Sequence, residues 1–188
     1  MSTGYQIKEQ DGLYYLTIQI VGWVDLFSRQ DYRDIVIDNL KYCQQHKGLV
    51  VYAYVIMSNH IHIIAQAEDN NLSAVLRDFK SYTSKCILNR ITEGAESRRE
   101  WLLYLFKQAA IKHKRNSQYQ VFTHENHAIH LYSDKFIDQK LEYIHDNPVR
   151  AGIVKEPEDY LYSSASNYAL EQPILLDVSI ITTTWKTI

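Results

Sequence analysis

Two adjacent apolar runs, residues 49–57 and 61–66, constrain the fold of this chain most strongly. Both have the length and composition of β-strands, and only the short segment Met57-Ser58-Asn59 offers a connection between them. Strands joined by so short a connection pair as antiparallel neighbours. We therefore expect a β-hairpin whose second strand opens at His60 and His62.

The two histidines, His60 and His62, are one residue apart in the expected strand. Residues i and i+2 of a strand project from the same face, so both imidazoles point together while Ile61 points to the opposite layer. Two imidazoles on one face can bind one metal ion. The alternative is a pair of half-buried strand histidines without a ligand, and the His-x-His pattern by itself favours that alternative.

The remaining periodicities place helices around this hairpin. A strand is expected at residues 13–21, and two short strand candidates lie at residues 121–122 and 128–132. Helices are expected at residues 30–46, 72–91, 99–112 and 134–147, the last ending at Asn147-Pro148. This order predicts an α+β fold: a ferredoxin-like sandwich with a mainly antiparallel sheet and helices packed on one face.

Composition excludes several classes of protein. The chain has 188 residues, of which 46% are hydrophobic and 22% charged, as in one globular domain. It contains no run of 18 apolar residues, and its first residues lack the basic flank and apolar core of a signal peptide. Cys43 and Cys86 have neither metal-site spacing nor a disulfide framework. We expect a cytoplasmic protein without a membrane span.

The formal net charge of −2 hides a local excess of positive charge. Residues 72–115 contain ten basic and four acidic residues, and residues 93–96, Glu-Gly-Ala-Glu, interrupt this segment. Such a segment suits a phosphate backbone, although a solvated helical face explains it equally well. The candidate phosphate contacts are Arg77, Lys80 and Lys85, with Tyr82 as a candidate stacking surface; a structural or solvent-facing role is the alternative for each.

Tyr143 and Asn147 are four residues apart on the expected last helix, so they share one face. With His60 and His62, the Asn147 carbonyl oxygen would complete a site for Mg²⁺ or Mn²⁺ that leaves coordination positions open. Tyrosine becomes a competent nucleophile only beside a polarised target, which a metal ion supplies. Asp146 is a competing oxygen ligand, and most of the 15 tyrosines must serve packing or the surface.

Three segments resemble a known family. Residues 56–62, Ile-Met-Ser-Asn-His-Ile-His, resemble the His-hydrophobic-His signature of the HUH nucleases. Residues 142–154, Glu-Tyr-Ile-His-Asp-Asn-Pro-Val-Arg-Ala-Gly-Ile-Val, resemble the Tyr-Ile-x-x-Asn-Pro-Val-x-Ala-Gly block of single-tyrosine transposases. Residues 157–165 resemble the segment that follows in the REP-associated tyrosine transposases. That group is the one the chain resembles most.

The resemblance implies a DNA strand transferase that cleaves and rejoins single-stranded DNA near hairpins. Tyr143 would be the nucleophile, forming a 5′-phosphotyrosine, and His60, His62 and Asn147 would bind Mg²⁺ or Mn²⁺. The expected domain spans residues 1–168, and residues 169–188 form a tail with the pattern of an edge strand. Some relatives act as dimers and others as monomers, so a homodimer stays open.

Two other functions fit the same residues. A host-domesticated descendant would be a non-catalytic DNA-binding module of the same fold, with binding that depends on neither metal nor Tyr143. A metal-dependent hydrolase would use His60 and His62 without a covalent step. The combination of the histidine pair, Tyr143 and Asn147 favours the strand transferase.

Overall fold

A four-stranded antiparallel sheet with strand order β2-β3-β1-β4 forms the centre of the computed structural model, which describes residues 6–112, 118–170 and 175–182. The strands are β1 (Tyr14–Gln19), β2 (Leu49–Ile56), β3 (His60–Ala67) and β4 (Ile129–His130). The α-helices are α1 (Gln30–Lys47), α2 (Leu72–Glu93), α3 (Arg99–Ile111), α4 (Asp134–Arg150) and α5 (Ala165–Leu170). Short 3₁₀ turns are η1 (Val21–Trp23), η2 (Leu26–Ser28) and η3 (Pro157–Asp159). The expected hairpin of β2 and β3 is confirmed.

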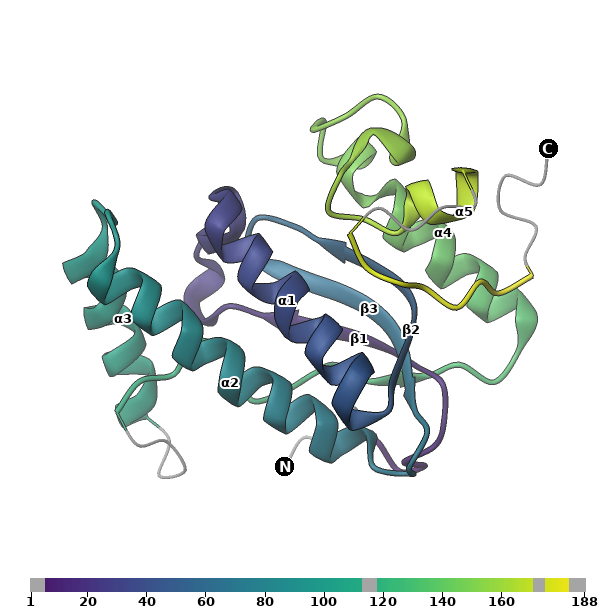
Figure 1. Ribbon diagram of the computed structural model, residues 1–188, viewed down its shortest axis with the longest axis horizontal. Coiled ribbons are helices and arrows are strands. Elements are labelled where there is room, and N and C mark those ends of the chain that lie inside the picture. Colours follow the sequence, from purple (N-terminus) through teal and green to yellow (C-terminus); the bar gives the residue numbers. More distant parts are fainter. Residues whose placement is uncertain (1–5, 113–117, 171–174, 183–188) are drawn as a thin grey trace.

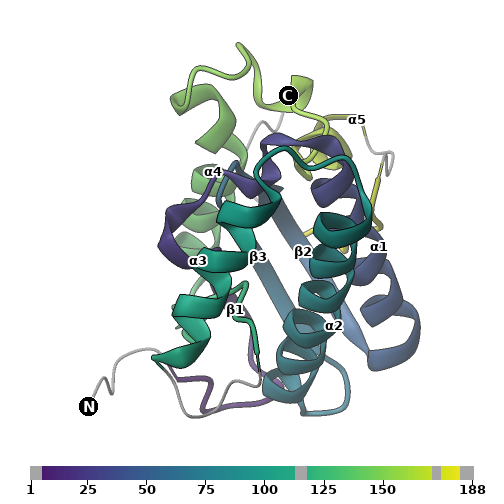
Figure 2. The ribbon, with the colours of Figure 1, turned by 90° about the vertical axis from the view of Figure 1, so that its left-hand side faces the viewer.

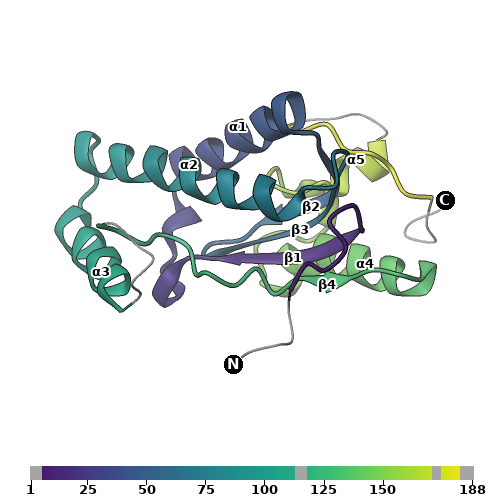
Figure 3. The same cartoon turned by 90° about the horizontal axis from the view of Figure 1, so that it is seen from below.

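Helices cover both faces of the sheet. Helices α1 and α2 run side by side over one face, and α4 lies across the other (Figure 2, Figure 3). The α+β class and the antiparallel sheet are confirmed, but the expectation that helices pack on one face is wrong for α4. The strand sequences explain the second layer: residues 61–65 of β3 are buried without alternation, as in a strand covered on both sides.

The register of β1 against β3 determines what surrounds the histidines. Thr17 lies opposite His62, and Gln19 lies opposite His60. Directly opposed residues of an antiparallel pair project from the same face. Alternate residues of β1 therefore stand beside the histidines on the face that α4 covers.

The helix ends follow from local chemistry. Helix α1 ends at Gly48, whose left-handed backbone (φ 64°) lets its N–H donate to the Cys43 carbonyl. Helix α4 continues through Pro148 to Arg150, three residues beyond the expected end at Asn147-Pro148. A proline in the last turn removes one backbone hydrogen bond, while the Ala151 N–H still donates to the Asn147 carbonyl. The Pro148 signal thus marks the last turn and not the final residue.

The two edges of the sheet are covered by irregular segments. On the β2 side, Ser163 forms an isolated bridge with Val55, and the Ser179 N–H donates to the Val51 carbonyl at 2.8 Å. Residues 175–182 form no strand, so the expected edge strand is wrong for this part of the tail; residues 171–174 and 183–188 lie outside the described residues. The boundary predicted after residue 168 falls inside α5 and stays a prediction.

At the opposite side of the sheet, the first residues of β1 pair with β4. The end of β1 and the residues that follow it form backbone hydrogen bonds with residues 121–126. Of the two short strand candidates, residues 129–130 form β4, and Phe122 forms only an isolated bridge with Ile20. Residues 94–98 connect α2 to α3.

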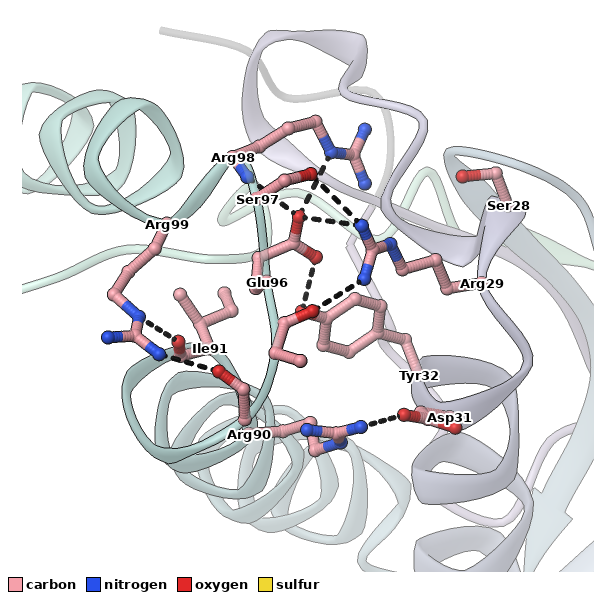
Figure 4. Close-up of polar contacts among 12 residues, drawn as sticks. Ser28, Arg29, Asp31, Tyr32, Arg90, Ile91, Glu96, Ser97, Arg98 and Arg99 are labelled. Atoms are coloured by element: carbon pink, nitrogen blue, oxygen red, sulfur yellow. Dashed lines mark hydrogen bonds and ion pairs between the residues drawn. The ribbon is translucent and has the colours of Figure 1, made fainter.

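A buried carboxylate anchors this loop (Figure 4). The Glu96 side chain is 2% exposed, accepts a hydrogen bond from the Tyr32 hydroxyl at 2.8 Å and lies 3.3 Å from the Arg29 guanidinium. Arg98 approaches the same carboxylate at 3.4 Å and also pairs with Asp25. Glu96, read from the sequence as an interruption of a basic segment, therefore holds the start of α3 against α1.

In the described parts of the chain, the helices are too short or too polar to cross a lipid bilayer.

Candidate metal and tyrosine site

His60 and His62 lie together on the face of β3 that α4 covers. Their ring centroids are 4.5 Å apart, and the rings meet edge to face. His62 is 5% exposed, whereas His60 is half-buried. The expectation that both imidazoles share one face is confirmed.

Hydrogen bonds at Nδ1 orient both rings. Nδ1 of His62 lies 2.7 Å from the Tyr15 hydroxyl and 3.0 Å from the Thr17 hydroxyl. Nδ1 of His60 lies 2.6 Å from the Asn59 Oδ1 atom. A carbonyl oxygen only accepts, so His60 Nδ1 carries the hydrogen and the Nε2 lone pair of the neutral ring remains for a ligand. This is the arrangement in which outer residues orient metal-binding histidines.

Burial keeps both rings neutral. Desolvation lowers the pKa of His60 below its ordinary value. Desolvation, together with the nearby His60 and Lys140, lowers the pKa of His62 to about 3. Metal ions bind the neutral imidazole, so the histidines are in the ligating form at neutral pH.

Tyr143 reaches this pair from α4. Its ring centroid lies 5.4 Å from that of His62 and 6.3 Å from that of Tyr15. The side chain is 36% exposed, so a bound strand can approach the hydroxyl. Two cations flank the ring: the Lys140 ammonium at 5.7 Å and the Arg150 guanidinium at 5.3 Å from its centroid.

Asn147 lies one turn after Tyr143, and its amide Nδ2 donates to the Tyr143 carbonyl at 3.0 Å. Among the described residues, neither Asn147 nor the competing ligand Asp146 makes a hydrogen bond to the histidines. The structure thus brings His60, His62 and Tyr143 into contact, with Asn147 on the adjoining turn.

The candidate metal ligands are two imidazoles and one amide. The described part of the chain has no cluster of three or more His, Cys, Asp and Glu side chains suited to a metal. The expected set differs from such a cluster because its third ligand is an amide. Two oriented, neutral imidazoles and an amide side chain on the adjoining turn of α4 have the chemistry of an open Mn²⁺ or Mg²⁺ site more than of a closed structural zinc site.

Four residues of this site escaped the sequence reasoning: Tyr15, Thr17, Lys140 and Arg150. Lys140 and Arg150 stand three residues before and seven after Tyr143, a helical spacing that was available as a signal. The positions of Tyr15 and Thr17 depend on the register between β1 and β3, which no local pattern reveals.

The candidate phosphate contacts on α2 fall into two groups. The ammonium of the half-buried Lys80 lies 2.6 Å from the Thr123 carbonyl and 2.8 Å from Asn126 Oδ1, and burial lowers its pKa to about 8. Lys80 thus holds residues 123–126 against α2. Arg77 and Lys85 are exposed and line a groove beside those residues, with Arg77 also paired to Asp78. Tyr82 is exposed and stacks on Tyr42 of α1, away from that groove.

Comparisons with known proteins agree with this architecture. A family model described as "Transposase IS200 like" matches residues 24–140, which include both histidines and end before Tyr143. A solved structure, "Structure of the REP associates tyrosine transposase bound to a REP hairpin", is similar with a TM-score of 0.61 and 16% identity. The similarity covers 98% of this chain and 96% of that one, and at this identity it concerns the fold. No curated protein matches the chain.

Proposed function

Because the chain belongs to the IS200-like transposase family, we propose that it cleaves and rejoins single-stranded DNA beside a hairpin, using Tyr143 as the nucleophile. The observation that carries this proposal is the contact of Tyr143 on α4 with His62, which in turn contacts His60 on the same strand β3. In the chain, Tyr143 follows His60 by 83 positions and His62 by 81 positions. The proposed reaction needs a nucleophile and a phosphate-polarising ion side by side, and these three residues would supply them.

The reaction exchanges one phosphodiester bond for another. The Tyr143 oxygen forms a bond to phosphorus, and the bond from phosphorus to the 3′-oxygen breaks. The phenol proton is lost to solvent, and the departing 3′-oxygen takes up a proton to become a hydroxyl. The product is a 5′-phosphotyrosine, from which attack by a 3′-hydroxyl restores a DNA strand and frees Tyr143.

Residues of this chain position the reacting groups and supply much of the positive charge near the phosphate. Lys140 and Arg150, which lie beside the Tyr143 ring, attract the phosphate. His60 and His62, with Asn147, would hold Mg²⁺ or Mn²⁺, which when bound polarises a phosphate oxygen. Tyr15, Thr17 and Asn59 keep the imidazoles in place.

A hairpin-bearing single strand is the substrate that we propose. The structural relative with 16% identity was solved with a REP hairpin, and its fold extends over nearly the whole of this chain. The exposed Arg77 and Lys85 on α2 are proposed as phosphate contacts, whereas Lys80 is assigned to holding residues 123–126.

The test is covalent trapping. Wild type, Tyr143→Phe and the control Tyr42→Phe are incubated with labelled hairpin-bearing single-stranded DNA and Mn²⁺, then separated on a denaturing gel. Tyr42 is an exposed tyrosine on α1 outside the site. We expect a labelled adduct with wild type and Tyr42→Phe, and none with Tyr143→Phe or with EDTA.

Three other results would reject the proposal. An adduct that persists in Tyr143→Phe would remove this tyrosine from the reaction. Metal-independent DNA binding with no adduct from any protein would identify a non-catalytic binding module, and metal-dependent cleavage by Tyr143→Phe would identify a hydrolase.

A further inference from the structure

Helix α3 lies at the end of the molecule away from α5 (Figure 1). A groove of about 740 Å³ is lined by α3 and by residues 120–127. Its third side is η1, where Gly22 packs against Leu105 of α3. The mechanism proposed above uses none of these residues. Because η1 directly follows β1, the groove begins next to the catalytic face of the sheet.

One stripe of α3 lines this groove with exposed aromatic and polar side chains. Trp101, Tyr104, Gln108 and Lys112 follow each other at intervals of three or four residues and therefore share a face. Trp101 is 50% exposed and Tyr104 is 65% exposed, while Leu102, Phe106 and Ala110 on another face enter the core. The core does not require these two rings, so their exposure needs another explanation.

A strained tryptophan connects the groove to the histidine pair. Trp23, the residue after Gly22, has a left-handed backbone (φ 56°) and a side chain that is 63% exposed. Bulky residues rarely adopt this conformation, and such strain concentrates at functional sites. The Trp23 ring lies 6.2 Å from that of His60, edge to face.

Asn59 links the two residues through its side chain. Its Nδ2 atom donates to the Trp23 carbonyl at 3.4 Å, and its Oδ1 atom accepts from His60 Nδ1. The side chain that orients a candidate metal ligand thus also holds the strained tryptophan. This continuity indicates that an occupant of the groove extends from the reaction centre.

We propose that this groove binds an unpaired segment of the DNA strand, with bases stacked on Trp23, Trp101 and Tyr104. Exposed aromatic faces beside cations are the usual surface for single strands, since every base offers a face for stacking. Lys112 at the groove and Lys107 on the same helix supply positive charge, and the Glu125 carboxylate lies 4.0 Å from His127. This inference rests on the proposed function for its ligand.

The experiment measures what an unpaired flank adds to hairpin binding. A fluorescein-labelled DNA hairpin with an unpaired flank of six nucleotides on the 5′ or 3′ side is compared with the same hairpin without a flank. Binding is followed by anisotropy in EDTA, where no cleavage occurs. The variants are W101A/Y104A and Trp23→Gly, and the control is Y42A/Y82A, which removes two equally exposed aromatic rings on α1 and α2.

We expect W101A/Y104A to weaken binding of a flanked hairpin by ~10-fold or more. Binding of the hairpin without a flank should not change, and W101F/Y104F should restore most of the loss. Trp23→Gly should also weaken flanked binding while its melting temperature stays equal or rises, because glycine adopts this backbone without strain. If Trp23 had only a structural role, Trp23→Gly would lower the melting temperature and leave binding of the flanked hairpin unchanged.

Equal affinity of wild type for flanked and unflanked hairpins would overturn the inference, as would an equal loss in Y42A/Y82A. A Tyr143 adduct with flank-independent binding would leave the proposed function standing and reject the groove. Flank binding that is lost in W101A/Y104A, together with no adduct from wild type, would support the groove and reject the nuclease.

Discussion

His62 is buried, neutral and held by two hydroxyl groups at one ring nitrogen, and each of these properties follows from its place opposite Thr17 in the sheet. Burial disfavours the imidazolium, so the ring stays neutral at neutral pH. This burial makes the free energy of unfolding depend on pH, because His62 binds a proton far more readily in the solvated, unfolded chain than in the folded protein.

The stability of the metal-free protein should therefore depend on His62. Its pKa is about 3 in the folded state and ~6.5 in the unfolded chain, so the unfolded state takes up the proton first as pH falls. His62 should thus lower the free energy of unfolding below pH ~6.5, by up to ~1.4 kcal/mol per pH unit. Urea titrations in EDTA between pH 4 and 7 should give a shallower slope for His62→Gln.

The exposed His46 of α1 supplies the matched control, and His46→Gln should keep the wild-type slope. Parallel stability curves for wild type and His62→Gln would show that His62 titrates normally and would remove the argument for a pre-neutralised ligand.

Among the elements, those with long periodic patterns were predictable and those defined by tertiary contacts were not. Helices α1 and α2 match their expected ranges because apolar positions and breakers such as Gly48 act locally. Within α2, Phe79, Thr83 and Ile87 are buried, whereas Tyr82 is exposed. The layer of α4 was not predictable because the sequence shows an amphipathic face without showing which surface it covers.

The candidate site shows the same division. The pairs His60 with His62 and Tyr143 with Asn147 were predictable from strand and helix periodicity. Their mutual contact was suggested by the ligand chemistry of these side chains and by the resemblance, because periodicity does not show which separate elements meet. Lys80 and Glu96 were read from charge alone, and both instead bind partners within the protein.

The stability of the protein should depend on Glu96, which anchors the loop between α2 and α3. Glu96→Gln leaves Arg29 and Arg98 without their buried anionic partner, so the free energy of unfolding should fall by ~3 kcal/mol. Glu93→Gln, at an exposed position at the end of α2, is the control and should stay within ~0.5 kcal/mol of wild type. Urea denaturation at neutral pH measures both, and equal stabilities of the two variants would contradict the anchoring role.

At the scale of the whole molecule, five of the eight described cations in residues 72–115 bind groups of the protein itself. Arg90 pairs with Asp31, Arg98 with Asp25 and Glu96, and Arg99 donates to backbone carbonyls. In the described ranges, Lys85, Lys107 and Lys112 are exposed and have no ion-pair partner; Lys114 and Arg115 lie outside them. A mildly acidic chain can therefore still present a few cations to DNA.

The salt dependence of DNA binding should separate the two kinds of cation. Lys85→Gln should reduce the slope of log K against log salt by ~0.7, the value for one contact with a single-strand phosphate. Arg90→Gln removes the same charge from α2 but should leave the slope unchanged, because Arg90 already pairs with Asp31. Identical slopes for Lys85→Gln and wild type would exclude Lys85 as a phosphate contact.

The central claim, that Tyr143 takes the DNA phosphate, is tested most directly by mass spectrometry of the trapped adduct. Trypsin cleavage after Lys140 and Arg150 yields residues 141–150, a peptide whose only tyrosine is Tyr143. After nuclease trimming of adduct formed with Mn²⁺, we predict that this peptide carries the nucleotide mass on Tyr143. A nucleotide mass on any other peptide, with residues 141–150 unmodified, would contradict the account.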